Sequence, residues 1–188
     1  IKHSPNESKP YSLQIGNPKV ITDLTKIKTV GDFRSDDIKA GGEGAPLAPL
    51  FHQFILQSNN LKRGVIVNIG GISNLTVVNN ESEVFGYDCG PGNCLMDAWS
   101  RSHGKGDYDK AGAWASRGKF NLDLLKLMME DPYFSADNPK STGTDYFNLS
   151  WLNEKISKLN SIPSADDVQA TLSELSAQII YHELKKLK

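Results

Sequence analysis

The segment GVIVNIGGISNLTVV, residues 64–78, decides the fold class because two β-rich runs meet at a pair of glycines. Residues 65–67 and 75–78 are mostly β-branched, and Gly70 and Gly71 lie between the two runs. Paired runs of this kind with small turn residues between them are typical of a β-hairpin. The sequence therefore predicts two antiparallel strands with a tight turn near residue 70.

The predicted hairpin tip is more polar than a turn requires. Glycine lets backbone N–H groups approach an anion closely, and hydroxyl and amide side chains supply further donors. A plain turn remains the alternative for this glycine pair taken alone. We expect a phosphate group to bind at the tip, through Asn68, Gly70, Gly71, Ser73 and Asn74.

Two further glycine clusters lie at predicted corners of the chain, GGEGAP at residues 41–46 and CGPGN at residues 89–93. Neither matches the dinucleotide fingerprint or the P-loop pattern, so those two nucleotide-binding folds are excluded. Either cluster alone could be an ordinary turn, but three together favour anion binding. The candidates are Gly90, Gly92 and Asn93 for phosphate, and Gly41, Gly42 and Gly44 for the substrate.

The remaining patterns alternate between strands and helices. Residues 11–16 and 27–33 read as strands, and residues 17–26 read as a helix with Asn17 as N-cap and Pro18 in the first turn. Apolar spacing predicts further helices over residues 47–56, 94–101, 120–131 and 151–159, and a last one from about residue 164. This order excludes an all-helical bundle and favours an α/β protein.

Composition narrows the class of protein. The 188 residues carry 21 basic and 22 acidic side chains, a net charge of −1, which does not favour a nucleic-acid or anionic-membrane surface. No apolar run approaches the ~20 residues of a membrane span, and the first residues lack the apolar core of a signal peptide. Cys89 and Cys94 lack the spacing and partners of a zinc site, which favours reduced thiols in a reducing compartment.

Carboxylates precede the first glycine cluster. Asp32, Asp36 and Asp37 flank Arg34 at the end of a predicted strand, a usual place for a general base in α/β enzymes, although a solvated surface or helix capping is an equal alternative. Three other acids could cap a helix or hold Mg²⁺ through water: Asp88, Asp97 and Asp109. A polar turn could contact a sugar or phosphate through Lys140, Ser141 and Thr142.

Five motifs occur in the order found in one enzyme family: VGDFRSDDIKAGGEGAPLAPLFH, VNIGGISNLT, GYDCGPGNCLMDAW, YDKAGAWASRGK and PKSTGTDYFNLSWL. Through them the sequence closely resembles the anhydro-N-acetylmuramic acid kinase family over nearly its whole length. The resemblance implies the actin, Hsp70 and sugar-kinase superfamily, whose members have two ribonuclease-H-like α/β domains. Residues 1–61 would be the C-terminal part of the first domain, and residues 62–188 would be the second domain, truncated at its C-terminus.

The same resemblance implies a reaction and its residues. ATP, Mg²⁺ and water would convert 1,6-anhydro-N-acetylmuramic acid to N-acetylmuramic acid 6-phosphate in cytoplasmic recycling of cell-wall sugars. In the D-F-R-x-x-D pattern the matching acids are Asp32 and Asp37. Asp37 would be the base, supported by Asp32 and Arg34, and Asp88 would join Gly41, Gly42, Gly44, Lys140, Ser141 and Thr142 at the substrate.

Partners and alternatives follow from the resemblance as well. The expected partners are the sugar and ATP, with no nucleic acid and no membrane, and a homodimer is among the expected assemblies. The family's N-terminal D-G-T-S motif and its C-terminal glycine-rich motif do not occur in this sequence. The chain is therefore expected to be a central fragment that binds ATP poorly and is inactive alone. A nucleotide-binding ATPase or chaperone-like module of the same fold is the other alternative.

Overall fold

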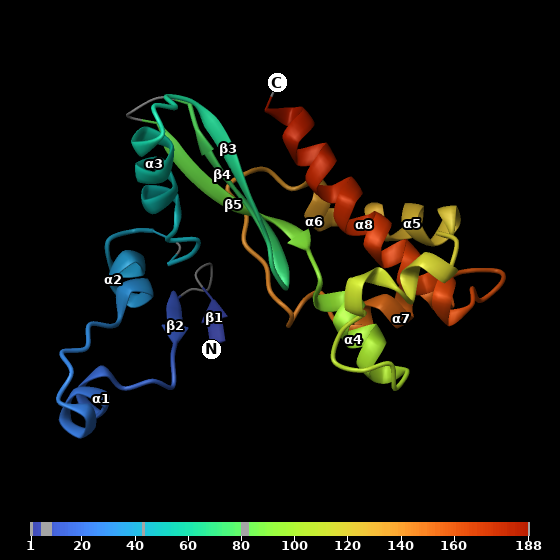
Figure 1. Cartoon of the computed structure of the whole chain (residues 1–188), viewed down its shortest axis with the longest axis horizontal. Helices are drawn as coiled ribbons and strands as arrows, with labels where there is room; N and C mark the ends of the chain where they lie inside the picture. Colours follow the sequence, from blue (N-terminus) through green and yellow to red (C-terminus); the bar gives the residue numbers. More distant parts are fainter. Residues whose placement is uncertain (1, 5–8, 43, 80–82, 188) are drawn as a thin grey trace. The chain divides into compact units, whose positions relative to one another are not determined.

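The computed structural model describes residues 2–4, 9–42, 44–79 and 83–187 (Figure 1). The chain divides into two compact units, Ile1–Leu50 and Phe51–Lys188, and each is described by itself. The assignment of residues 1–61 and 62–188 to two domains of a larger fold stays a prediction.

The first unit holds short elements. Strands β1 (Lys2–Ser4) and β2 (Tyr11–Leu13) pair antiparallel. Helix α1 (Pro18–Thr25) begins as predicted, since the Asn17 side chain accepts hydrogen bonds from the N–H groups of Lys19 and Val20. Helix α2 (Phe33–Lys39) follows, and helix α3 (Pro49–Ser58) begins at the end of this unit.

The strand predicted over residues 27–33 is wrong. Residues 27–32 form no regular element, and Phe33 begins helix α2. The β-branched residues in this stretch favour an extended chain, but a strand also needs a neighbouring strand to satisfy its backbone groups. Strands β1 and β2 pair with each other, and Thr29 N–H instead bonds the Thr22 side chain 3.1 Å away.

The second unit is built on a three-stranded antiparallel sheet in the order β3 (Gly64–Ile69), β4 (Ile72–Val78) and β5 (Val84–Pro91). The predicted hairpin is confirmed, because Asn68 lies opposite Asn74 and Ile69 lies opposite Ser73. Between β4 and β5 the register shifts by one residue: Ser73 pairs with Gly90, and Asn74 pairs with Asp88. The intervening residue is therefore a bulge, which changes the face to which β5 presents its side chains.

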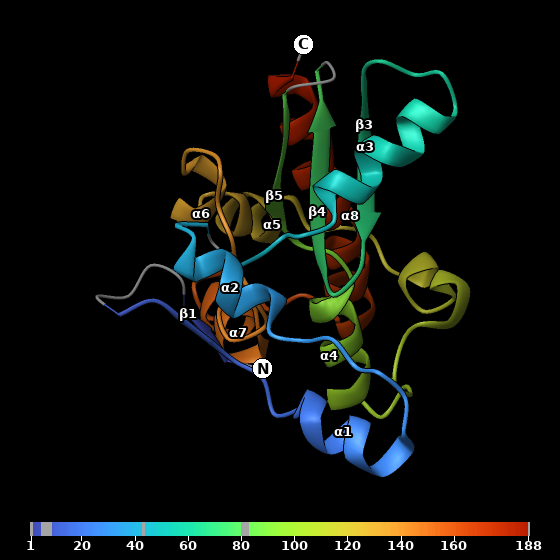
Figure 2. The ribbon, with the colours of Figure 1, turned by 90° about the vertical axis from the view of Figure 1, so that its left-hand side faces the viewer.

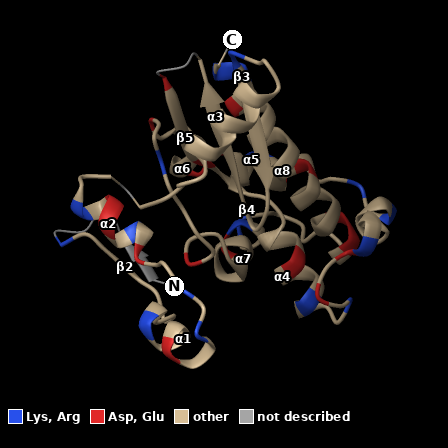
Figure 3. Cartoon of the chain, turned by 60° about the vertical axis from the view of Figure 1, so that its left-hand side comes forward, with Lys and Arg blue, Asp and Glu red and all other residues tan. Residues whose placement is uncertain are grey.

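Helices complete this unit and confirm the helical predictions from residue 94 onward. They are α4 (Cys94–Ser102), α5 (Leu122–Met129), α6 (Pro132–Ser135), α7 (Leu149–Ser157) and α8 (Ala165–Lys186), with 3₁₀ turns at Lys110–Gly112 and Ala115–Arg117. Ser164 caps α8, which has acids in its first turn and lysines in its last, in agreement with the helix dipole (Figure 3).

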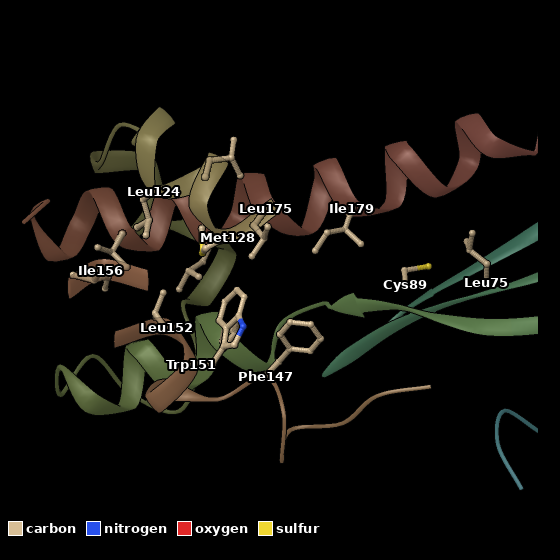
Figure 4. Packing of buried hydrophobic residues seen from close by; sticks show 14 of the residues in the cluster. Leu75, Cys89, Leu124, Met128, Phe147, Trp151, Leu152, Ile156, Leu175 and Ile179 are labelled. Carbon is tan, nitrogen blue, oxygen red and sulfur yellow. The ribbon is translucent and has the colours of Figure 1, made fainter. Parts of the chain in front are cut away.

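The core lies between one face of the sheet and the helices. Leu75 and Cys89 of the sheet belong to the same buried cluster as Leu175 and Ile179 of α8, and α5 and α7 extend it (Figure 4). On the opposite face, α3 lies against the sheet, where His52 Nδ1 is 2.7 Å from Thr76 Oγ1 (Figure 2).

The chain is thus a mixed α/β protein with an antiparallel sheet, as the sequence predicts. None of the helices in the described part of the chain is long and apolar enough to cross a membrane.

Candidate functional site

The tip of the β3–β4 hairpin is tied to the start of helix α4. The carbonyl of Gly71 accepts the N–H groups of Gly92 (2.9 Å) and Cys94 (3.1 Å), and the carbonyl of Gly70 accepts the N–H of Asn93 (2.8 Å). A Cβ at Gly92 would lie 2.2 Å from the Gly70 oxygen, so only glycine permits this approach. These contacts place the CGPGN segment beside the hairpin tip.

The same bonds decide which donors remain for a ligand. The N–H groups of Gly92 and Asn93 are used within the protein, so the expectation that they face an anion is not supported. The N–H groups of Gly70 and Gly71 have no acceptor among the residues that the structure describes. The positive end of α4 lies next to them, and both features favour an anion at this tip.

Two predicted phosphate contacts lie on the core side of the sheet. Ser73 is 0% exposed, and its hydroxyl has no hydrogen-bond partner among the residues that the structure describes. A Cβ at Gly90 would lie 2.7 Å from Phe134 Cε1, so this glycine is needed for packing. Neither residue faces the surface of the hairpin tip. The alternation Ser73, Leu75, Val77 along β4 is the signal that could have placed Ser73 among the core residues.

A polar row crosses the other face of the sheet. Asn68, Asn74 and Asp88 are aligned across the three strands, on the face opposite the core. The Asp88 carboxylate accepts the Ser141 hydroxyl at 3.0 Å and the Thr142 N–H at 3.1 Å. The structure therefore brings together five of the residues that the sequence singles out.

Lys140 has a different environment from its two neighbours in the chain. Its ammonium is 3.1 Å from Glu183 Oε1 and also donates to the Tyr133 carbonyl at 3.2 Å. The side chains of Lys140 and Glu183 are 5% and 3% exposed, so Lys140 points into the protein, away from any ligand at the surface.

A pocket of about 610 Å³ opens at the hairpin tip. It lies between Gly71, the first turns of α4 and the start of α7, and its polar lining includes Asn93, Asp97, Arg101, Thr144 and Asn148. Burial raises the pKa of Asp97, and the Arg101 charge opposes that rise.

Sequence reasoning missed part of this lining. Arg101 follows Asp97 by four residues, so helical spacing could have placed both on one face of α4. Asn148 is the N-cap of α7, because its side chain accepts hydrogen bonds from the N–H groups of Ser150 and Trp151. Asparagine directly before a helical pattern is a recognisable capping signal. Thr144 has no recognisable signal in the sequence.

A second pocket of about 550 Å³ adjoins the first along the same helix, and the two share Asn93, Asp97 and Arg101. Its lining includes Asp109, but both carboxylate oxygens of that residue accept backbone N–H groups, from Trp114 and Ala115 at 2.8 Å. Asp109 therefore caps the loop at residues 114–115.

In the first unit, the glycine loop wraps around the Asp37 carboxylate. Asp37 Oδ2 accepts the Gly44 N–H at 2.7 Å, and its carbonyl accepts the Gly42 N–H at 2.8 Å. A Cβ at Gly42 would lie 2.2 Å from Asp37 Oδ2, and one at Gly44 would lie 2.9 Å from the Arg34 carbonyl. Positive φ angles at Gly41 (94°) and Gly44 (70°) make the return turn.

The neighbouring acids differ from Asp37. Asp36 is exposed and pairs with Lys39 at 2.9 Å. Asp32 precedes α2 with a left-handed φ of 65° and makes no side-chain cap bond. Asp32 directly precedes helix α2, and Asp36 and Asp37 lie within it. The glycine loop is therefore preceded by a helix, where the sequence predicts a strand, and is followed by helix α3. Of the three acids, Asp37 is the one that the described contacts bind to Gly42 and Gly44.

The side chains near the hairpin tip include carboxylates, the donor groups that a nucleotide-bound Mg²⁺ needs from a protein. Mg²⁺ is usually held by one or two carboxylates, waters and the phosphates of the substrate. Asp97 lies in the pocket and Asp88 lies in the polar row, so both could contribute through water. Within the described residues there is no group of three or more His, Cys, Asp or Glu suited to a metal.

Comparison with known proteins agrees with these features. The family model described as "Anhydro-N-acetylmuramic acid kinase" matches residues 1–188. Relatives of that name are 48% identical over 185 residues in Pseudomonas syringae pv. tomato and 47% identical over 188 residues in Pasteurella multocida. Another, from Coxiella burnetii, is 46% identical over 182 residues.

The matches cover 98%, 100% and 96% of this chain but 50%, 49% and 48% of the respective relatives. The chain thus spans about half the length of the curated relatives it matches, and its match to the family model extends from end to end. The chain belongs to the anhydro-N-acetylmuramic acid kinase family.

Proposed function

We propose that the protein carrying this chain is an ATP-dependent kinase that converts 1,6-anhydro-N-acetylmuramic acid to N-acetylmuramic acid 6-phosphate. The observation that carries the proposal is the hairpin tip, where the N–H groups of Gly70 and Gly71 lack acceptors in the described part of the chain and a pocket of about 610 Å³ adjoins them. Family membership supports the substrate, since relatives at 46–48% identity bear this name.

The two units have distinct roles in this proposal. The hairpin tip and the pocket beside α4 bind the phosphates and the nucleoside of ATP, and Asp88 with Asp97 holds Mg²⁺ through water. Asp37, in its glycine loop, contacts the sugar side of the reaction. The fold is the ribonuclease-H-like fold of actin, Hsp70 and sugar kinases. A homodimer and a cytoplasmic location are predictions from the resemblance alone.

Asp37 acts as the general base. Its carboxylate takes a proton from a water molecule, whose oxygen forms a bond to the anomeric carbon while the bond from that carbon to the bridging oxygen breaks. The freed oxygen keeps the electron pair and receives the γ-phosphoryl group, and ADP leaves. ATP supplies the phosphoryl group, and Mg²⁺ offsets its charge. Positioning and charge neutralisation account for most of the catalysis in such transfers.

The test is turnover by the full-length protein with ATP and the anhydro sugar, followed by phosphorus NMR of the products. Sugar 6-phosphate is expected, and ATP hydrolysis without it would favour an ATPase of the same fold. Asp37→Asn should lower kcat by about 10²–10⁴ with sugar and nucleotide binding nearly intact, because general-base contributions have that size.

Asp36→Asn is the matched control, because Asp36 is exposed and pairs only with its helix neighbour Lys39 among the described contacts. It should leave kcat unchanged. Asp32→Asn should affect folding or the placement of Arg34 more than the chemistry. A dead Asp32→Asn variant beside an active Asp37→Asn variant would reverse the assignment of the base.

A further inference from the structure

A buried ion pair lies beneath the polar row of the sheet. Lys140 Nζ is 3.1 Å from Glu183 Oε1, and the two residues are 43 positions apart in sequence, one before α7 and the other near the end of α8. Lys140 also donates to the Tyr133 carbonyl. The pair therefore joins the segment that precedes α7 to the C-terminal helix and to α6.

The charges of this pair are not needed to fill the core. Moving two charges out of water carries a large desolvation cost, and apolar residues of similar volume often stabilise a core equally well. Burial opposes ionisation of Glu183, yet hydrogen bonds from Lys186 and Lys140 outweigh it and hold its pKa below the ordinary value. Burial raises the pKa of the nearby Cys89 thiol to about 12, so this neighbour stays neutral.

The ion pair is connected to Asp88 by three hydrogen bonds. The Asp88 N–H donates to the Lys140 carbonyl at 2.9 Å, which fixes the backbone of β5 against the segment. The next two residues then reach the Asp88 carboxylate, through the Ser141 hydroxyl at 3.0 Å and the Thr142 N–H at 3.1 Å. The placement of the Asp88 carboxylate thus depends on where Lys140 is held.

We propose that the buried Lys140–Glu183 ion pair is the anchor that positions the Asp88 carboxylate in the polar row. Lys140 and Glu183 are then positioning residues, and Lys140 does not contact the substrate. The inference rests on the proposed kinase function, in which Asp88 holds Mg²⁺ through water. A carboxylate needs such an anchor because a displacement of about 1 Å can cost up to 10²-fold in rate.

The experiment compares three variants of the full-length protein. Glu183→Gln leaves the Lys140 ammonium without its counter-charge. Lys140→Met leaves the Glu183 carboxylate with Lys186, 2.9 Å away, as its remaining ion-pair partner among the described residues. The double variant, Lys140→Met with Glu183→Met, replaces both charges by apolar groups. The matched control is the exposed pair Glu154 and Lys158, 2.7 Å apart, changed to Gln and Met respectively.

Three quantities are measured in each variant: the urea midpoint, hydrogen exchange at the Thr142 amide, and kcat and KM with the anhydro sugar. The single variants should lower the urea midpoint, speed exchange at Thr142 and lower kcat by about 10- to 100-fold with a smaller change in KM. The double variant should regain the urea midpoint without regaining kcat or the protection of Thr142. The control pair should change none of the three.

Two results would overturn the proposal. One is recovery of kcat together with the urea midpoint in the double variant, which would indicate a purely structural pair. The other is unchanged exchange at Thr142 in both single variants. If the unmodified protein makes no sugar phosphate, the proposed function fails, and the Thr142 exchange still decides whether the ion pair anchors this segment.

Discussion

The physical reason for having a glycine differs from one position of this chain to another. Gly92 permits a backbone contact with the hairpin carbonyl, whereas Gly90 makes room for Phe134. Gly42 leaves room for the carboxylate that we assign as the base, and Gly70 has no atom nearer than 3.6 Å to the position of an added Cβ. The same residue type therefore permits close packing at Gly92, Gly90 and Gly42, whereas an added Cβ at Gly70 would meet only ordinary contacts.

Gly42→Ala is expected to affect catalysis more than stability. The new Cβ would lie 2.2 Å from Asp37 Oδ2, so the carboxylate has to rotate and give up its bond to the Gly44 N–H. We expect kcat of the full-length protein to fall about 10- to 100-fold, with a small change in the urea midpoint. Gly16→Ala is the control, since an added Cβ there meets nothing within 4 Å. Equal kcat in both variants would contradict the loop's role in placing Asp37.

Between elements, Asp131 is the main polar junction of the helical region. Its carboxylate accepts from Trp151 Nε1 at 2.8 Å and from the Tyr146 hydroxyl at 2.9 Å, and it lies 3.3 Å from Lys155 Nζ. It also caps α6 through the Tyr133 N–H. Burial opposes its ionisation, but the hydrogen bonds from Trp151, the Tyr133 N–H, Tyr146 and Lys155 hold its pKa below the ordinary 3.8.

This junction predicts a pH dependence of stability. Because the folded pKa of Asp131 is lower than the unfolded pKa, its contribution is complete above the unfolded value and is lost as the pH falls through the folded value. Asp131→Asn should lower the free energy of unfolding by about 1.5–3 kcal/mol at pH 7. Urea unfolding between pH 7 and pH 3 measures it, and the variant should lose less stability than the parent on acidification. An equal loss in both would contradict this role.

The junction between the hairpin and α4 predicts a second change at this scale. Gly92→Ala places a Cβ 2.2 Å from the Gly70 oxygen and 2.7 Å from Ser73 Oγ, so backbone has to move. We expect the free energy of unfolding to fall by about 1–3 kcal/mol, the usual cost of overpacking. Gly70→Ala is the matched comparison for stability, because its Cβ would meet only ordinary contacts. Chemical denaturation should give a clearly lower free energy of unfolding for Gly92→Ala than for Gly70→Ala.

For the whole molecule, burial is distributed unequally between the two units. The buried cluster is drawn from residues 75–179, while α1 and α2 contain no buried residue. Segments with few buried apolar contacts open at low free energy. Large apolar side chains such as Leu24, Ile27 and Val30 are mostly exposed in the first unit.

Native-state hydrogen exchange should therefore show different amide protection in the two units. Amides of β4, β5 and α8 are expected to exchange slowest, with protection close to that of global unfolding, and amides of α1 and α2 are expected to exchange fastest. Mass spectrometry of peptic fragments measures this directly. Equal protection of α1 and β4 would show that residues 1–50 share the stability of the sheet.

Features that depend on neighbouring residues can be predicted from the sequence alone. The hairpin at Gly70 and Gly71 and the helix starts after Asn17 and Ser164 follow from turn and capping chemistry within a few positions. The five motifs and their order along the chain also indicated the protein family. Such signals are local, so no knowledge of the rest of the fold is needed to read them.

Features that depend on residues far apart in the chain become visible in the folded structure. Residues 27–32 look like a strand but find no strand to pair with in the described part of the chain. The pairing of β4 with β5 places Asp88 opposite Asn74 in the polar row, and Lys140 pairs with Glu183, 43 positions away. Strand pairing, register and buried ion pairs each need a partner that is brought close by folding, and the local sequence holds no record of that partner.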